Sequence, residues 1–424
     1  MILRGATLCE LDPLRVEQRD LRIVEDTIVE RGEKFVPAQG EEVIDLDGAV
    51  VLPGLVNAHT HLYSSLARGM PPPERAPKNF PEILDLIWWR LDRALDLPDV
   101  QASALVGAHD AALCGVTTVV DHHASPNAIA GSLAEVRAAL SKVGVRGVVA
   151  YETTDRCGAA GTQAGLQENA DALRAQTADL RALVGAHACL TLSDESIAAC
   201  GSLARAHASG VHIHAAEAVE DRNALERLVG VLGEKTLIAH GVHLSEPEIA
   251  RVRQSGAWLL HCPRSNLNNG VGTASAAKFG ARAALGTDGI GNDLFEELRC
   301  AFFRSQETKN PLSMAQAIGL LSGGHRLATE LFDRPFGALR QGAVADLIIF
   351  DYAAPTPLNT ESLAGHLLYG FSTRYVRDVL CAGRWIVRNG EHVSWSASKV
   401  AHVGQEAAAR IWPRLHKPMK SLLS

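Results

Sequence analysis

Two histidines one residue apart, His59 and His61, follow a Pro-Gly pair in the stretch LPGLVNAHTHLYSSLARGM, which begins at Leu52. Side chains at positions i and i+2 of a strand point to the same side, so both imidazoles could bind one metal ion. The same pattern also fits two solvated loop histidines, which is the commoner case for an isolated pair. The meaning of the pair therefore depends on further ligands elsewhere in the chain.

Further candidate ligands occur at the ends of three later apolar runs. They are His212, His214 and Glu217 in HIHAAE, His240 and His243 in AHGVHL, and Asp288 in LGTDGIG. Imidazole nitrogens with one carboxylate suit zinc or another divalent first-row metal, and a catalytic site must keep one position open for water. The sequence therefore predicts a divalent metal held by His59, His61, His214 and Asp288.

These side chains need strands that end at one common edge. The chain from 54 to 336 has eight short apolar runs that end in polar residues and are separated by stretches with helical spacing of apolar residues. Repeated strand and helix units of this number are typical of an α/β fold, the (β/α)8 TIM barrel, whose catalytic groups lie at the C-terminal strand ends. We predict such a barrel over 54–336, with the candidate ligands at its mouth.

The two flanks of this central segment have a different pattern. Apolar and polar residues alternate in 1–53 and 337–400, and Gly and Asp interrupt the runs. This pattern is typical of antiparallel strands. We expect them to pair into one small β-sandwich domain built from both ends of the chain. The remaining segment, 401–424, has the composition and spacing of a terminal helix.

Composition narrows the class of protein. Hydrophobic residues make up 47% and charged residues 21% of the chain, as in ordinary globular proteins. The formal net charge is -7, so the chain lacks the excess of Lys and Arg that binding to nucleic acid or to an anionic membrane would need. No signal peptide and no run of about 18 apolar residues is evident. The eight cysteines lack a C-x-x-C pair, which favours reduced thiols. We expect a cytoplasmic protein with a small-molecule substrate.

Several motifs together resemble one family. PGLVNAHTH, HIHAAE, AHGVHL and LGTDG, in this order and spacing, resemble the amidohydrolase superfamily in its cytosine-deaminase-like branch, and GALRQGAVADLIIFD is similar to the segment where those enzymes resume their β-domain. HTHLYSSLARGM, VVDHHASPN, TLSDE, PRSNLNN and LGTDGIG further resemble SsnA-type aminohydrolases, which are relatives of chlorohydrolases and of adenosylhomocysteine, guanine and 8-oxoguanine deaminases. The resemblance covers almost the whole chain.

The resemblance assigns the metal ligands to strands. His59 and His61 match the first-strand ligands, His214 matches the fifth-strand ligand, and Asp288 matches the eighth-strand ligand. Binuclear members carry a carboxylated lysine on the fourth strand, and RALVGAHACLTLSD has no lysine. The resemblance therefore implies one divalent metal ion, Zn²⁺ in the first place and Fe²⁺ as the alternative.

The resemblance also implies catalytic roles. Asp288 would accept a proton from the attacking water, His240 would polarise that water, and Glu217 would carry a proton to a ring nitrogen of the substrate. His187, in GAHACLTLSD, matches a histidine near the substrate. Members of the family are usually dimers or larger, so we expect a homo-oligomer.

Other residues carry interpretations that the sequence leaves open. We expect His212 to alternate away from His214 and to pack toward the helices, and His243 to be a loop contact. One of His122 and His123 could touch substrate, with His123 as the candidate, and His261 could support either the site or a loop. Trp88, beside Trp89 in EILDLIWWRLD, could form an aromatic pocket wall or lie in a helix under a loop.

The sequence supports one leading function. We expect a metal-dependent hydrolase of carbon–nitrogen bonds other than peptide bonds, in nucleobase metabolism, which deaminates a purine-like or other nitrogen heterocycle and releases ammonia. The alternatives are ring opening of a cyclic amide or amidine, as in imidazolone-type relatives, and a catalytically silent metal-binding barrel. The signatures of base-flipping zinc deaminases, α/β-hydrolases and phosphate-binding loops are absent from the chain.

Overall fold

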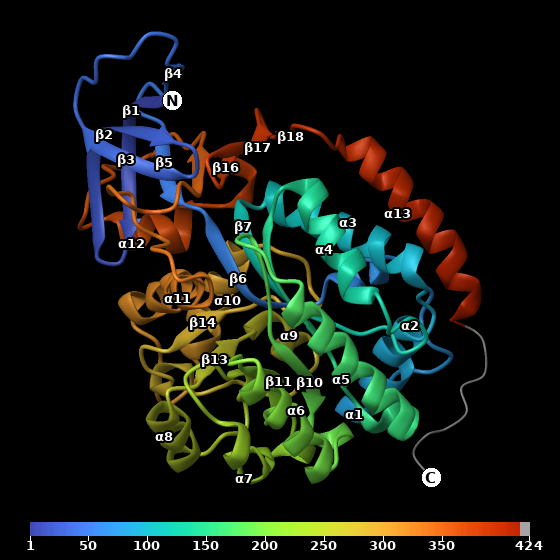
Figure 1. The fold of residues 1–424 in the computed structure, drawn as a ribbon. Helices are drawn as coiled ribbons and strands as arrows, with labels where there is room; N and C mark the ends of the chain where they lie inside the picture. Colours follow the sequence, from blue (N-terminus) through green and yellow to red (C-terminus); the bar gives the residue numbers. More distant parts are fainter. Residues whose placement is uncertain (416–424) are drawn as a thin grey trace.

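The central part of the chain is a closed parallel barrel (Figure 1). The computed structural model describes residues 1–415, in which two parallel sheets, β6-β7-β8-β9 and β10-β11-β12-β13-β14, are joined by bridges at Thr60–Asp288 and Thr153–Ala186. The strands are β6 (Leu55–Thr60), β7 (Val116–His123), β8 (Arg146–Tyr151), β9 (Leu180–Ala182), β10 (Val184–Ala188), β11 (Val211–Ala215), β12 (Leu237–His240), β13 (Trp258–His261) and β14 (Ala283–Leu285). β9 and β10 follow each other across Leu183 and together act as the fourth barrel strand.

Helices surround the barrel and connect its strands (Figure 1). They are α3 (Leu97–Leu113), α4 (Ser132–Val143), α5 (Gly158–Arg174), α6 (Asp194–Ala206), α7 (Ala224–Arg227), α8 (Glu246–Ser255), α9 (Pro263–Asn268), α10 (Leu294–Ser305) and α11 (Met314–Phe332). Their ends follow local chemistry, as at α3, where Asp96 and Asp99 form a capping box and Pro98 occupies the first turn. None of the helices within residues 1–415 has both the length and the apolar character that crossing a membrane would need.

The flanks of the barrel share a second sheet. Within residues 1–415 this sheet has nine strands in the order β18-β17-β16-β15-β5-β1-β2-β3, with β4 paired to β1. The strands are β1 (Ile2–Leu11), β2 (Leu14–Val24), β3 (Thr27–Gly32), β4 (Val43–Asp45), β5 (Val50–Pro53), β15 (Leu347–Phe350), β16 (Val376–Cys381), β17 (Arg384–Arg388) and β18 (Glu391–His392). β5 pairs with β1 and with β15, so the two ends of the chain meet there. The predicted fold class, a barrel with a separate sheet domain from both termini, is confirmed.

The chain passes from the sheet domain to the barrel at Gly54, between β5 and β6. A Cβ at this position would lie 2.5 Å from the Thr117 side chain, so only glycine fits. The Gly54 amide donates to Asp346 O at 2.8 Å, and its carbonyl oxygen lies 2.9 Å from His325 Nε2. These contacts fix the start of the strand that carries His59 and His61.

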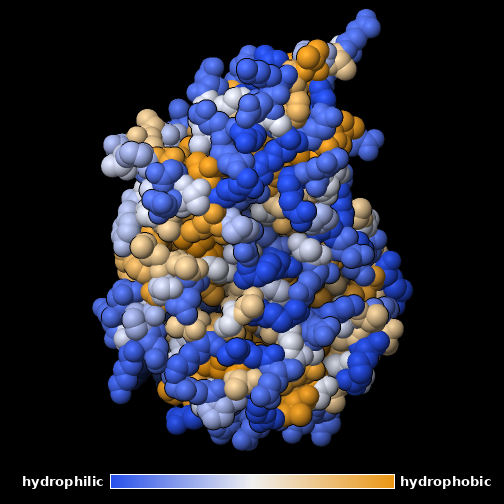
Figure 2. Space-filling model, turned by 90° about the vertical axis from the view of Figure 1, so that its left-hand side faces the viewer, coloured by the Kyte–Doolittle hydropathy of each residue, from blue (hydrophilic) through white to orange (hydrophobic). Residues whose placement is uncertain are grey.

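The C-terminal helix packs on the barrel helices. α13 (Ala397–Ile411) begins before the predicted boundary at 401 and continues into η10 (Trp412–Arg414), while 416–424 lie outside the described residues. Arg410 and Arg414 bind Asp99 at the start of α3. The face of the molecule in Figure 2 is covered mainly by hydrophilic residues, with hydrophobic ones scattered among them.

Candidate active site

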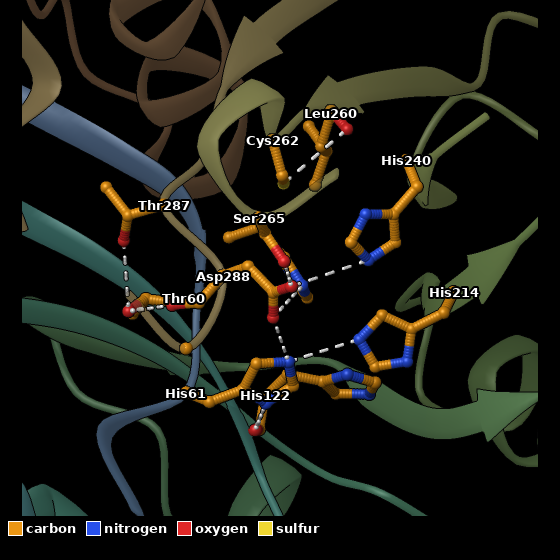
Figure 3. A network of polar contacts seen from close by, with 12 residues as sticks. Thr60, His61, His122, His214, His240, Leu260, Cys262, Ser265, Thr287 and Asp288 are labelled. Atoms are coloured by element: carbon orange, nitrogen blue, oxygen red, sulfur yellow. Dashed lines mark hydrogen bonds and ion pairs between the residues drawn. The ribbon is translucent and has the colours of Figure 1, made fainter. Parts of the chain in front are cut away.

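The four predicted metal ligands lie together at the barrel mouth, and Figure 3 shows three of them, His61, His214 and Asp288. His61 Nε2 is 2.9 Å from Asp288 Oδ1 and 3.2 Å from His214 Nε2, and His59 Nε2 is 3.8 Å from Asp288 Oδ1. One nitrogen each from His59, His214 and His240 and one Asp288 oxygen all lie within 4.8 Å of one another. The first, fifth, sixth and eighth barrel strands thus deliver their side chains to one point.

The tautomers of two of these histidines follow from their backbone contacts. His61 Nδ1 lies 2.6 Å from the His122 carbonyl oxygen, and His214 Nδ1 lies 2.8 Å from that of His187. A carbonyl only accepts, so both Nδ1 atoms carry the proton and both Nε2 atoms present lone pairs to each other. Two facing lone pairs need a cation or a proton between them. The pair therefore fits a metal ion.

A buried nitrogen without a partner supports this fit. His59 is fully buried, and its Nε2 has no hydrogen-bond partner among residues 1–415. His59 Nδ1 lies 2.9 Å from His212 Nε2, which orients the ring. Although burial raises the pKa of Asp288, the contact with His61 and the surrounding imidazoles lower it well below the usual range and keep it ionised. Three imidazoles and one carboxylate are a donor set that a divalent metal accepts.

The backbone conformation at the ends of two strands positions the side chains of the cluster. A Cβ at Gly286 would lie 2.9 Å from the His59 carbonyl oxygen and 3.0 Å from its amide nitrogen, so glycine lets β14 approach β6 closely. The amides of Thr287 and Asp288 then donate to His59 O at 2.8 and 3.0 Å. Asp288 itself has φ 53° and His240 has φ 73°, in the left-handed region that non-glycine residues adopt uncommonly.

Glu217 and His240 lie beside the ligand cluster. Glu217 Oε2 is 3.5 Å from His240 Nε2, and Asn269 Nδ2 donates to Glu217 Oε1 at 3.4 Å. Burial raises the pKa of Glu217 to about 7, so the carboxyl can hold a proton near neutral pH. His240 Nδ1 lies 2.9 Å from Asn266 Oδ1, and its Nε2 has no hydrogen-bond partner among the described residues.

A cavity opens on this cluster and encloses about 660 Å³ of empty space, part of it open to solvent. Its outer wall comes from α1 (Phe80–Ile83), η2 (Leu84–Trp88) and α2 (Trp89–Asp92). η2 is a single π-helical turn, a feature frequent at functional sites. The lining side chains from this segment are Phe80, Leu84, Trp88, Trp89 and Asp92. Trp88 thus lies on the cavity wall, and so does the predicted substrate contact His187.

Two expectations about histidines are corrected by the geometry. His123 does not line the cavity, because it alternates with His122 along the strand; its ring lies edge-on to Tyr63 at 6.1 Å between centroids, and its Nε2 lies 2.9 Å from Ser125 Oγ. His212 faces the barrel interior rather than the helices, because residues two apart on a strand share a face. Its ring stacks on His122 at 4.4 Å between centroids.

The remaining histidines have contacts outside the ligand cluster. His243 Nε2 lies 2.8 Å from Val271 O, which is a loop contact. His261 is buried and packs edge-on against Phe279 at 6.1 Å between ring centroids.

Sequence analysis missed three carboxylates of the cavity wall, Asp92, Glu152 and Asp221. Glu152 follows the third barrel strand, and its position at a C-terminal strand end was the signal that could have identified it. Asp92 lies one helical turn from Trp88, the residue already proposed for the wall. Asp221 accepts a hydrogen bond from the Ala216 amide. These signals are weak alone because acidic residues are common on loops and helices.

A parallel barrel whose strand ends carry a histidine and aspartate metal site defines the class of metal-dependent barrel hydrolases. The Amidohydrolase family model matches residues 50–386, and the chain belongs to this family.

The chain is 28% identical over 422 residues to the 5-methylthioadenosine/S-adenosylhomocysteine deaminase of Pyrococcus furiosus, covering 94% of this chain and 98% of the relative. It is 27% identical over 448 residues to the 5'-deoxyadenosine deaminase of Methanosarcina mazei, covering 98% and 99%.

Solved structures share the fold. A zinc-bound adenosine deaminase from Xanthomonas campestris superposes with a TM-score of 0.83 at 22% identity, over 97% of this chain and 98% of that one. The atrazine chlorohydrolase TrzN from Arthrobacter aurescens, complexed with zinc, gives a TM-score of 0.80 at 22% identity, over 96% and 99%.

Proposed function

We propose that this protein is a metal-dependent deaminase that hydrolyses the exocyclic carbon–nitrogen bond of a purine-like heterocycle and releases ammonia. The observation that carries the proposal is the buried Glu217 carboxyl, placed 3.5 Å from His240 beside the histidine and aspartate cluster, in one cavity. A hydrolase that expels an amine needs such a proton donor next to its nucleophile. The names of the curated relatives, both deaminases of adenosine-type compounds, support the same chemistry.

The metal would be held by His59, His61, His214 and Asp288, as one ion, with Zn²⁺ expected first and Fe²⁺ as the alternative. When bound, a divalent metal lowers the pKa of water from about 15.7 toward about 7 and so supplies hydroxide at neutral pH. The Nδ1 atoms of His61 and His214 face the backbone carbonyls of His122 and His187. These contacts keep the two imidazoles in the tautomer whose Nε2 can bind a cation.

Asp288 and His240 would act on the attacking water. Asp288 is ionised and accepts a proton from the water, with Ser265 Oγ donating to its second oxygen. His240 presents an unpartnered Nε2 that, once protonated, donates a hydrogen bond to the oxygen developing on the attacked carbon. Asn266 holds the ring in that orientation.

Glu217 would complete the reaction by proton transfer. It donates its proton to the ring nitrogen next to the attacked carbon, and it recovers a proton that originated in the water. The carbon–nitrogen bond then breaks as the amino group takes up the proton that Asp288 accepted from the water, and it leaves as ammonia. Each such transfer by a positioned acid or base is worth about 10²- to 10⁴-fold in rate.

The substrate ring would lie against the wall that carries Trp88, with His187 as a polar contact. His187 Nδ1 is 2.6 Å from Thr191 Oγ1, which leaves Nε2 to face the cavity. We also expect the protein to act in nucleobase metabolism in the cytoplasm as a homo-oligomer.

The test is an ammonia-release screen with purified, metal-analysed protein. The panel contains purines, adenosine-type nucleosides, pyrimidines, pterins and triazines, and we expect release from at least one purine-like ring. Loss of a cyclic substrate without ammonia would instead identify a ring-opening hydrolase. Substoichiometric metal together with no turnover of any ring would point to a catalytically silent barrel.

A further inference from the structure

His122 is a buried histidine that the proposed reaction does not use. It lies on β7, is 0% exposed, and is not among the side chains that line the cavity. Neither of its ring nitrogens has a hydrogen-bond partner among residues 1–415. A buried polar group without a partner is costly, and a substrate in the cavity would not contact this ring. The two nitrogens therefore need a partner inside the barrel.

The ring of His122 lies beside the histidines of the predicted metal site (Figure 3). Its centroid is 4.8 Å from that of His214 and 5.7 Å from that of His61. One ring nitrogen each from His59, His61, His122 and His214 all lie within 4.8 Å of one another. An ion at the usual zinc–nitrogen distance of about 2.0–2.1 Å would draw these rings slightly together. Four imidazoles are thus close enough to hold a cation without Asp288.

Lone pairs are available for such an ion. The backbone contacts of His61 Nδ1 and His214 Nδ1 leave a lone pair on each Nε2. His59 Nδ1 faces His212 Nε2 at 2.9 Å, and His59 Nε2 has no hydrogen-bond partner within the described part of the chain. A neutral imidazole has one lone pair, and in His122 no described residue engages it. Each of the four histidines can therefore give one pair to the same cation.

Glu152 supplies negative charge beside these rings. It is buried, and its Oε1 lies 3.5 Å from His122 Nδ1 and 3.2 Å from His61 Nδ1. Although burial raises the pKa of Glu152, His187 and His61 lower it to about 2. A divalent ion among neutral imidazoles in a buried site needs such a countercharge. Glu152 can balance an ion there as Asp288 does in the predicted site.

We propose that His59, His61, His122 and His214 form a second, all-imidazole position for a late divalent first-row cation such as Zn²⁺ or Cu²⁺. This set differs from the predicted one in having His122 in place of Asp288. The three shared imidazoles have one lone pair each, so one ion occupies one set at a time. An ion held by imidazoles alone stays bound while Asp288 is free of metal. The competing explanation is that His122 is only a packing residue of the barrel interior.

The test removes Asp288 and then His122 and measures metal binding without turnover. Asp288→Ala should still bind one Zn²⁺ per chain, because the four imidazoles remain. Adding His122→Ala to this variant should weaken binding at least about tenfold, since even residues that only support a ligand change metal affinity about 10- to 100-fold. His122→Ala alone should keep its Zn²⁺ through Asp288. Metal analysis after dialysis gives the stoichiometry, and competition with a chelator gives the Kd.

His261→Ala is the matched control. His261 is also a buried histidine at a strand end, but it packs against Phe279. In the Asp288→Ala background it should leave the Kd for Zn²⁺ unchanged. Equal weakening by His122→Ala and His261→Ala in that background would overturn the proposal. Loss of Zn²⁺ from Asp288→Ala alone, with its circular dichroism unchanged, would contradict it as well.

A crystal structure of Zn²⁺-loaded Asp288→Ala tests the same position without the double variant. Anomalous scattering locates the ion, and we expect a His122 nitrogen at about 2.0–2.1 Å from it. An ion bound by other residues, with His122 outside its coordination, would show that His122 only packs in the barrel. None of these measurements uses turnover, so a failed ammonia-release screen would remove the proposed deamination and leave this metal position standing.

Discussion

Individual residues of the candidate site could be predicted where a residue type that binds metal stands at the end of a predicted strand. His59, His61, His214 and Asp288 were predicted as ligands because metal-binding residue types stand at predicted strand ends, and the structure brings their side chains together. Asp92 was missed because its partner Arg156 follows another strand, so only the folded chain shows the pair. His212 was misplaced because its face was assigned against the two-residue period of a strand, which had been applied correctly to His59 and His61.

Replacement of Glu217 by Gln tests the proton carrier. The amide keeps the shape of the side chain and cannot donate an acidic proton, so kcat should fall about 10²- to 10⁴-fold while metal content stays unchanged. Steady-state ammonia release and metal analysis measure the two quantities. Near-normal turnover in this variant would remove Glu217 from the mechanism.

The pH dependence of kcat tests the protonation state of the same group. Burial raises the pKa of Glu217 to about 7, so its protonated, donating form is abundant below that pH and falls about tenfold per pH unit above it. We expect kcat to decline as pH rises through about 7. A kcat that stays flat from about pH 6 to 9 would contradict a titrating Glu217 donor.

At the scale of elements, the strands were easier to predict than the cavity wall. Each apolar run that was expected to form a barrel strand corresponds to a strand of the barrel, since burial on both faces leaves a continuous apolar signature. The π-helical turn η2 was not predicted, because no local rule marks the residue at which a helix widens to place Leu84 and Trp88 on one cavity.

The close contact of β14 with β6 can be tested at Gly286. In Gly286→Ala the new methyl group would meet the His59 backbone at 2.9 Å, which should lower the free energy of unfolding by about 1 to 3 kcal/mol and weaken zinc binding. Urea unfolding and zinc titration measure both effects.

Gly319→Ala in α11 is the matched control. A Cβ there has no atom within 4 Å, so the alanine should be neutral or stabilise the helix by up to about 1 kcal/mol. Equal behaviour of the two variants would show that the β6–β14 contact tolerates a side chain.

At the scale of the whole molecule, the metal site joins strands from opposite ends of the barrel sequence. An ion that binds only the folded chain stabilises it, by about 4 kcal/mol at a thousandfold excess over its Kd. Treatment with a chelator should therefore abolish ammonia release and lower the Tm by several degrees, and added Zn²⁺ should restore both. Calorimetry with and without chelator measures the change in Tm. An unchanged Tm together with lost activity would mean that the ion acts without contributing to stability.

The direct passage from β5 through Gly54 into β6 has a consequence for how the site opens. There is no linker between the sheet domain and the strand that bears His59 and His61, and hydrogen bonds on both sides of Gly54 fasten the crossing. A swing of one domain against the other would pull directly on the metal ligands. Entry of a substrate therefore does not depend on such a swing, because the cavity beside the outer wall, α1 to α2, is already open in part to solvent.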